Sequence, residues 1–174
     1  FYRNKMEFSF GSGPEGDLYV GLHYLGRYNR IFDLEACFLQ SDISNRVVQL
    51  TREFAAEAGL PPYDLREHKG LLRFLIIREG KSTGQLMVDL VVANYPDSGV
   101  DEVVERILEA LPEITTFMVT LHTGKAQVAI GERQFVIKGE GRIVEHCLGL
   151  EFDISSRSFS MSFEIPPLQN YEGI

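Results

Sequence analysis

The sequence predicts an α+β fold in which an antiparallel or mixed β-sheet, built from hairpins, carries two main helices. Most segments alternate apolar and polar residues and come in pairs separated by short turn-forming stretches. Only two stretches show apolar residues at helical spacing. The chain has 174 residues, of which 44% are hydrophobic, and this suits one domain with a substantial core.

Residues 4–10 and 18–25 show the alternation of two strands. The turn-forming residues 11–16 between them favour an antiparallel hairpin. A short extended segment at 30–34 follows.

The first helix is predicted to begin at Ser41 or Asp42, because either side chain can cap a helix N-terminus. Gly59, followed by two prolines, ends it. Its apolar positions recur at spacings of three and four residues: Ile43, Val47, Leu50, Phe54 and Ala58.

Residues 71–77 and 85–95 are almost continuously apolar, which predicts two central strands joined by a hairpin connection at 80–84. A second helix is predicted from Asp101 to Pro112, since proline cannot continue a helix. Five further strands are predicted, at 115–123, 127–130, 134–137, 143–147 and 151–154.

Composition restricts the class of partner and the cellular compartment. Seventeen basic against 25 acidic residues give a net charge of −8, so any contact with nucleic acid must be local. Cys37 and Cys147 have no metal-binding spacing, which favours a reducing cytoplasm. The chain contains no apolar run of about 20 residues, which is the length that would predict a membrane span. A start at Phe1, with no initiator Met, suggests a piece of a longer protein.

Motifs for catalysis are weak, and no catalytic residue is assigned. The GxG at residues 139–141 joins two predicted strands, which indicates a hairpin turn and not a nucleotide loop. His146 and Cys147 are consecutive in a strand and therefore point to opposite faces. The isolated histidines are interpreted as structural or exposed residues: His23, His68 and His122.

Basic residues in or beside the strands leave two interpretations open. Cations interleaved with aromatic side chains on a sheet face can hold phosphates and stack bases. Alternatively, charges along a strand protect an exposed sheet edge. The basic positions are Arg3, Lys5, Arg27, Arg30, Arg73, Arg78, Lys81 and Arg142, and the aromatic ones are Tyr2, Tyr24 and Tyr28.

Four blocks of sequence, in this order, resemble one enzyme family, the S-adenosylmethionine-dependent RNA (uracil-5-)-methyltransferases that modify ribosomal and transfer RNA. The resemblance extends from Tyr2 to Phe159. The blocks are Tyr2-Arg3-Asn4-Lys5 with Phe8 and Phe10, "GRYNRIFDLEAC" from Gly26, "LLRFLIIREGKSTGQLMVDLVV" from Leu71, and "GEGRIVEHCLGLEFDISSRSF" from Gly139.

The resemblance implies that residues 1–159 form the central domain of such an enzyme and that 160–174 are an atypical tail, truncated or non-native. The intact enzyme would transfer a methyl group from S-adenosylmethionine to C5 of a uridine, in 23S rRNA in preference to tRNA. Its catalytic cysteine, cofactor loop and general base would lie downstream of this chain. The piece alone is therefore expected to be inactive and to bind no cofactor. The alternative is a non-enzymatic interaction or RNA-binding module of the same fold.

Site residues are implied by the same resemblance. Tyr2, Arg3 and Lys5 would contact RNA beside the target base. Cys37 corresponds to the last of four ligands of a [4Fe-4S] cluster in some members, with the other three upstream, so the cluster could form only in the intact enzyme. In this chain alone, Cys37 is expected to be a buried thiol that caps the next helix.

Overall fold

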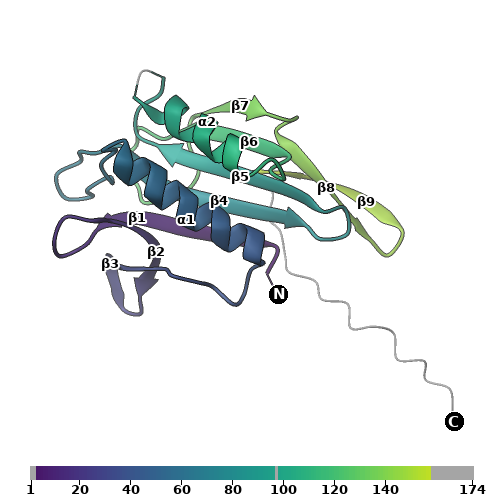
Figure 1. Cartoon of the computed structure of the whole chain (residues 1–174), viewed down its shortest axis with the longest axis horizontal. Coiled ribbons are helices and arrows are strands. Elements are labelled where there is room, and N and C mark those ends of the chain that lie inside the picture. The colour runs from purple at the N-terminus through teal and green to yellow at the C-terminus, as the bar shows by residue number, and fades with distance from the viewer. Residues whose placement is uncertain (1–2, 97, 158–174) are drawn as a thin grey trace, which may run out of the picture.

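Seven strands form one β-sheet, and two more form a separate hairpin (Figure 1) in this computed structural model, which describes residues 3–96 and 98–157. The large sheet comprises β1 (Lys5–Ser12), β2 (Leu18–Tyr24), β3 (Arg27–Asp33), β4 (Leu72–Gly80), β5 (Gln85–Val92), β6 (Thr116–Leu121) and β7 (Arg133–Lys138). The separate hairpin comprises β8 (Arg142–Cys147) and β9 (Leu150–Ser155). With helices α1 (Asp42–Glu57) and α2 (Val100–Ala110), this confirms the predicted α+β class.

The large sheet is mixed, with the strand order β3-β2-β1-β4-β5-β6-β7. All neighbours pair antiparallel except β5 and β6, which are parallel. Parallel neighbours need a crossover connection, and α2 lies in the segment that supplies it. The almost continuously apolar β4 and β5 occupy central positions, as their sequence predicts.

Helix α1 begins where its capping residues predict. The Ser41 hydroxyl accepts a hydrogen bond from the Ser44 amide at 3.2 Å, which satisfies one of the unpaired donors at the helix N-terminus. The hydroxyls of Ser41 and Ser44 both donate to the Glu79 carboxylate near the end of β4. The same residues therefore start the helix and attach it to the sheet.

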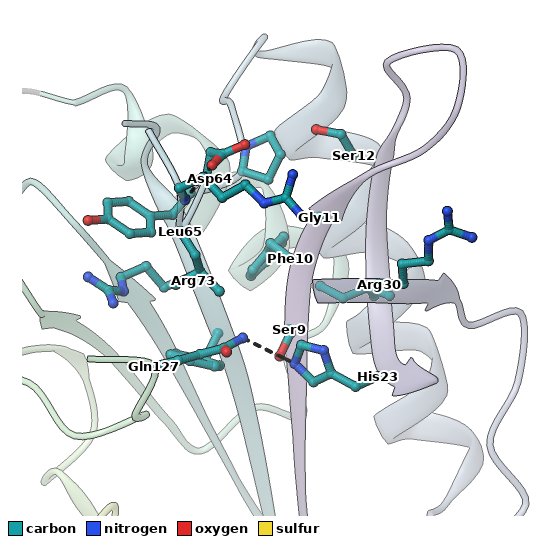
Figure 2. Close-up of a pocket in the computed structure, with 15 residues that line it drawn as sticks. Ser9, Phe10, Gly11, Ser12, His23, Arg30, Asp64, Leu65, Arg73 and Gln127 are labelled. Carbon is teal, nitrogen blue, oxygen red and sulfur yellow. Dashed lines mark hydrogen bonds between the residues drawn. The ribbon is translucent and has the colours of Figure 1, made fainter. Parts of the chain in front are cut away.

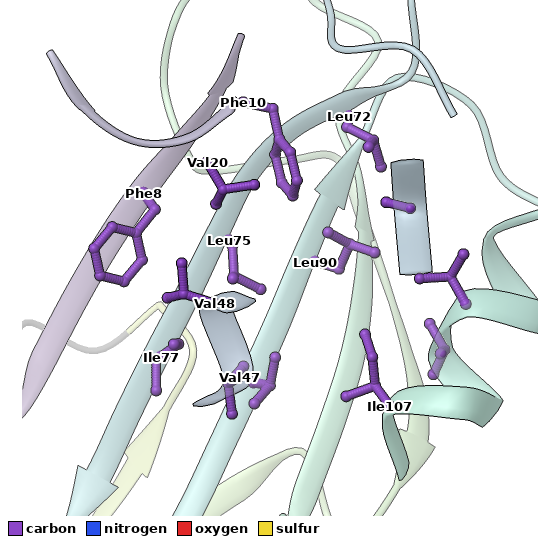
Figure 3. Packing of buried hydrophobic residues seen from close by; sticks show 14 of the residues in the cluster. Phe8, Phe10, Val20, Val47, Val48, Leu72, Leu75, Ile77, Leu90 and Ile107 are labelled. Carbon is purple, nitrogen blue, oxygen red and sulfur yellow. The ribbon is translucent and has the colours of Figure 1, made fainter. Parts of the chain in front are cut away.

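Both helices pack on one side of the large sheet, which we call the helix face (Figure 1). Figure 3 shows Phe8, Leu75 and Leu90 from the strands meeting Val47 and Ile107 from the helices. All five side chains are fully buried. Removing a side chain of this size from water contributes roughly 1.5–3 kcal/mol, so this layer is the main source of stability.

The opposite side of the same strands, which we call the outer face, is more polar. Along β4, Leu75 and Ile77 belong to the core under the helices, whereas Ile76 belongs to a separate cluster and Arg78 lies on the outer face. The pairing with β5 shifts register between Leu72 and Phe74, so one extra residue is accommodated there.

Two segments cover part of the outer face. The β8–β9 hairpin packs Ile143 and Ile154 against Met87 and Met118. The loop after β6 covers another part, where Ala129 contacts the small cluster of Phe74, Ile76 and Val91. Among the described residues, no helix has the length and apolar character required to cross a membrane.

The prediction of a strand at 127–130 is wrong, because these residues lie in the loop between β6 and β7. The carbonyl groups of His122, Gly124 and Ala126 point to the Arg73 guanidinium and hold the preceding chain in a bend. The short apolar run then covers the outer face through Ala129, and β-pairing resumes only at Arg133.

Candidate nucleic-acid interface

Arg3 and Lys5 lie at the start of β1. The backbone amide of Arg3 donates to the Leu39 carbonyl at 2.9 Å, and its side chain is exposed. The Lys5 side chain is 33% exposed, with Nζ 3.3 Å from the Glu7 carboxylate. A solvent-exposed ion pair of this kind contributes little, so both cations remain accessible to a polyanion. Tyr2, the third predicted RNA contact, lies outside the described residues.

Arg73 cannot serve on a phosphate-binding surface, contrary to that interpretation of the sequence. It is 4% exposed, and its two terminal nitrogens donate to the carbonyls of His122, Gly124 and Ala126 at 2.6–2.9 Å. Its guanidinium also stacks 4.1 Å from the centroid of the Tyr63 ring. Burial lowers the pKa of Arg73. This residue holds the loop after β6 onto the sheet.

Arg78 is also internal. It is 2% exposed and donates to the Ser156 carbonyl at 2.6 Å. Asp89 lies in the same buried region and accepts a hydrogen bond from the Thr120 hydroxyl at 2.7 Å. Burial raises the pKa of Asp89 to about 6, although the Thr120 hydrogen bond and the charge of Arg78 oppose this shift. The network joins the end of the β8–β9 hairpin to the central strands.

Two other predicted cations lie among carboxylates. The Arg142 guanidinium is 3.0 Å from Glu140 and 3.6 Å from Asp153. Lys81 lies in the β4–β5 turn, where its backbone amide donates to Glu145 at 2.6 Å. For Arg142 the structure favours charge balance within the fold over an open phosphate site.

A hollow on the outer face is lined by three of the remaining candidates, Tyr24, Arg27 and Arg30, and Figure 2 shows the part that contains Arg30. The Tyr28 side chain lies outside the described part of the chain. One cavity of about 300 Å³ lies beside the second half of β1 and is lined by His23, Arg30, Arg66 and Gln127 among others. An adjoining cavity of about 650 Å³ is lined by residues that include Tyr24 and Arg27. The two cavities share Ser9, His23, Phe74 and Gln127. We call the combined hollow the outer-face cleft.

Polar side chains meet at the centre of the outer-face cleft. Figure 2 shows Ser9, His23 and Gln127 converging, with His23 Nε2 3.0 Å from the Ser9 hydroxyl and 3.2 Å from the Gln127 amide nitrogen. If Nε2 accepts both hydrogen bonds, the proton of the neutral ring lies on Nδ1. His23 Nδ1 is buried and has no hydrogen-bond partner among the described residues.

The loop between α1 and β4 carries Arg66 to the cleft. The Asp64 carboxylate accepts hydrogen bonds from the backbone amides of Arg66 at 2.7 Å and Glu67 at 2.9 Å, and these bonds lower the pKa of Asp64. Gly70 closes the loop with a φ of 107°, and a Cβ there would lie 2.1 Å from the Pro62 carbonyl oxygen. The loop conformation is therefore fixed locally.

The outer-face cleft is cationic although the chain is acidic overall. Arg30 and Arg66 are both exposed, and neither forms an ion pair within residues 3–96 and 98–157. The first cavity has Asp64 as the carboxylate in its lining, and this group is already hydrogen-bonded to backbone amides. The second cavity is lined by both Glu7 and Arg27, and the Glu7 carboxylate is 3.3 Å from Lys5 Nζ.

The sequence located only part of this cleft. Tyr24, Arg27 and Arg30 were among the predicted cations and aromatics, and the structure brings them together. Arg66 was missed, because it lies in a loop that no pattern connects to the sheet. From its isolated position in the sequence, His23 is interpreted as a structural or exposed residue. Arg3 and Lys5 do not line either cavity.

Cys37 lies in the connection between β3 and α1 and is 7% exposed. Its backbone amide donates to the Asn45 side chain at 2.8 Å, and Asn45 donates back to the Cys37 carbonyl at 3.1 Å. Burial of the thiol is confirmed, but the expected capping role is wrong because Ser41 caps the helix. Among the described residues, no group of three or more His, Cys, Asp or Glu could hold a metal ion. This part of the chain therefore does not fit a [4Fe-4S] cluster by itself, since such a cluster needs four thiolates.

The GxG segment is a turn, as predicted. Residues 139–141 connect β7 to β8, and the two glycines have φ angles of 78° and 74°. His146 pairs with Glu151 on β9 at 3.2 Å.

The fold defines the class of protein to which the chain can be compared. A solved structure with a TM-score of 0.70 is the Pyrococcus abyssi tRNA (uracil-54, C5)-methyltransferase in complex with S-adenosyl-L-homocysteine. The match covers 92% of this chain and 36% of that protein, at 21% sequence identity. At this identity the comparison shows a shared fold.

Sequence comparison supplies closer relatives. A protein of Chlorobaculum tepidum named as an uncharacterized RNA methyltransferase is 36% identical over 173 residues, which cover 91% of this chain and 36% of the relative. A Halalkalibacterium halodurans protein of the same description is 32% identical over 168 residues, covering 97% of this chain and 36% of the relative. No family model matches the chain.

The sequence relatives agree with the predicted resemblance at the level of RNA methyltransferases, and the solved structure shares the fold. The chain spans about a third of the length of the curated relatives that it matches.

Proposed function

We propose that this chain is the RNA-gripping part of an S-adenosylmethionine-dependent methyltransferase that modifies C5 of a uridine, in large-subunit ribosomal RNA in preference to transfer RNA. The observation that supports this most directly is the similarity to proteins named RNA methyltransferases across 91% of the chain or more. The methyl transfer itself is assigned to other parts of the protein, since the matched relatives are nearly three times as long.

Within this proposal, Arg3 and Lys5 hold RNA phosphates beside the target base, together with Tyr2. A uridine must leave its stack before its C5 can react, and opening a base costs a few kcal/mol. Cations that hold the backbone near that base stabilise the opened geometry. The accessibility of the Arg3 and Lys5 side chains supports this role.

Methylation by the complete protein encoded by the gene tests the activity. Ribosomal and transfer RNA from cells that lack the gene would be incubated separately with this protein and S-adenosylmethionine, then digested and analysed for 5-methyluridine by mass spectrometry. We expect 5-methyluridine in the ribosomal RNA. If 5-methyluridine appeared in transfer RNA alone, transfer RNA would replace ribosomal RNA as the proposed substrate. Its absence from both would reject the methyltransferase in favour of the alternative, a non-enzymatic RNA-binding or interaction module.

The RNA contact can be tested in the same complete protein. Substituting both Arg3→Ala and Lys5→Ala should weaken RNA binding and flatten its dependence on salt by about one or two phosphate contacts. Arg46→Ala is the control, because Arg46 is an exposed residue of α1 on the helix face. An affinity and salt slope equal to those of the unmodified protein would remove Arg3 and Lys5 from the proposed interface.

We extend the proposal to Cys37 as one ligand of a [4Fe-4S] cluster in the complete protein, with three thiolates from outside this chain. Protein prepared without oxygen should then be brown and contain iron, and Cys37→Ser should lose both properties. Cys147→Ser is the matched control, since Cys147 lies on β8. Colourless, iron-free protein would exclude the cluster.

A further inference from the structure

We propose that the outer-face cleft is a second RNA-binding site, which holds a single-stranded segment through phosphate contacts to Arg30 and Arg66 and base stacking on Tyr24. The inference rests on the proposed function for the identity of the polyanion. It adds a site that is separate from the Tyr2–Lys5 segment and assigns a role to residues that segment does not include.

The positions of two arginines support phosphate binding in the cleft. Arg30 from β3 and Arg66 from the loop before β4 lie at the same cavity although they are distant in sequence. Both are exposed, and neither is paired with a carboxylate in the part of the chain that the structure describes. A guanidinium presents several donors in a planar fork that matches phosphate oxygens. Figure 2 shows Arg30 at the β3 side of the cavity, with its guanidinium directed away from Ser9 and His23.

Hydrogen bonds hold the walls of the cleft in fixed positions. Asp64 fixes the loop that bears Arg66 through its two bonds to backbone amides. Arg73 fixes the opposite wall by binding the carbonyls of the loop that contains Gln127. Because these walls are already ordered, binding a ligand costs less conformational entropy.

The chemistry inside the cleft suits nucleic acid better than a bare anion. Tyr24 is 51% exposed and is held edge-on by Phe32 at a centroid distance of 5.5 Å, so one ring face can accept a base. The exposed Gln127 side chain supplies a hydrogen-bonding group in the same cleft. Aromatic and polar groups interleaved with cations are typical of surfaces that bind single-stranded RNA.

The position of the cleft relative to Lys5 indicates the path that a bound RNA strand would follow along β1. Glu7 and Ser9 line the second cavity, so the hollow begins near Lys5 and continues past Gly11. Six residues of a β-strand separate Lys5 from Gly11, which corresponds to about 20 Å. One RNA strand can therefore run along β1 from the Arg3 and Lys5 end to Arg30 and Arg66, over several nucleotides.

Binding of a uridine-rich single-stranded oligoribonucleotide of about 20 nucleotides to the 174-residue chain tests the site. Fluorescence anisotropy would be measured over a series of salt concentrations. Arg30→Ala with Arg66→Ala should weaken binding at low salt by about tenfold and flatten the slope of log K against log salt by about 1.4, because each phosphate contact on a single strand contributes about 0.7. Arg30→Lys with Arg66→Lys should restore most of the slope, since the charge is retained.

A second variant separates stacking from charge. Tyr24→Ala should weaken binding by about fivefold or more without changing the salt slope, because base stacking releases no counterions. Arg46→Ala on α1 is the charge control for the arginine variants and should leave the affinity unchanged. Circular dichroism of each variant confirms that the fold is intact.

Two results would overturn the proposal. One is an unmodified chain that does not bind the oligoribonucleotide at all. The other is a double Arg30 and Arg66 variant whose affinity and salt slope equal those of the unmodified chain, even if the Arg3 and Lys5 variant is impaired. Failure of the proposed function has a different signature, since the complete protein would then form no 5-methyluridine while the binding assay could still respond to Arg30 and Arg66.

Discussion

The helix face and the outer face of one sheet have opposite characters although the same strands build both. On β4, Leu75 and Ile77 are buried against the helices in a mainly apolar layer. The outer face of that strand holds Arg78, and the network there includes a buried Asp89. The comparison teaches that burial alone does not indicate an apolar environment. The helix face supplies most of the stability. The outer face buries polar groups at some cost in stability, and these groups shape the cleft.

The two faces also differ in the interactions that their buried side chains require. A buried leucine needs only close packing, whereas a buried arginine needs hydrogen-bond acceptors in fixed positions. Arg73 obtains its acceptors from three carbonyls of one loop. The outer face therefore orders its loops through hydrogen bonds, and those loops form the walls of the cleft.

The largest expected effect comes from the helix face. Leu75→Ala should lower the free energy of unfolding by about 3–4 kcal/mol, because the side chain is fully buried and its removal leaves a cavity. Urea denaturation measures the change. Leu150→Ala is the matched control, since Leu150 is 61% exposed and should change stability by less than about 0.5 kcal/mol. Equal losses in the two variants would contradict the assignment of the helix face as the main core.

A smaller effect is expected from the outer face. Arg73→Ala should lower the free energy of unfolding by about 2–3 kcal/mol, because three carbonyls, those of His122, Gly124 and Ala126, lose a charged donor. Hydrogen exchange of the amides in the loop after β6 should accelerate more than that of the β4 and β5 amides. Uniform acceleration of all three segments would show that Arg73 does not act on this loop in particular.

The smallest effect is a pH dependence that belongs to Asp89. Its pKa of about 6 lies above the ordinary value of 3.8, so the folded state holds the proton more strongly than the unfolded state. This contribution to stability is present at low pH and is lost as the pH rises through the folded pKa. Between about pH 5 and pH 7 the loss is about 1 kcal/mol.

Asp89→Asn removes this titration. The variant should be less stable overall, because the buried charge of Arg78 loses its neighbouring carboxylate. Its stability should nevertheless change less between about pH 5 and pH 7 than that of the unmodified chain, as measured by urea denaturation at both values. An unchanged pH dependence would show that Asp89 is not the titrating group.

Local patterns predicted the elements well where the chain signals its own boundaries. The capping residue Ser41 and the stop at Gly59 located α1. Alternation located the hairpin that begins with β1, and two almost continuously apolar runs around a turn located the hairpin of β4 and β5. The prediction failed at 127–130, where a short apolar run serves as a cover over other residues. A run of this length has the same pattern in a strand and in a packed loop.

The candidate site was less predictable for the same reason. Arg30, Arg73 and Arg78 look alike in sequence, as cations within apolar strands. The structure leaves the first exposed and buries the other two. The difference depends on whether a loop from elsewhere in the chain supplies acceptors, and no local pattern contains that information. Arg66 reaches the cleft only because Asp64 and Gly70 fold its loop back toward β4.

By itself, the sequence determined the class of fold, the two helices, the central position of β4 and β5, and the resemblance to RNA methyltransferases. These properties depend on periodicity and on short-range capping, which are encoded in neighbouring residues. The tertiary structure decided which cations are internal, where the cleft lies and which side chains line it. Those properties depend on contacts between residues far apart in the chain, where one buried charge and its acceptors must be brought together at hydrogen-bond distance.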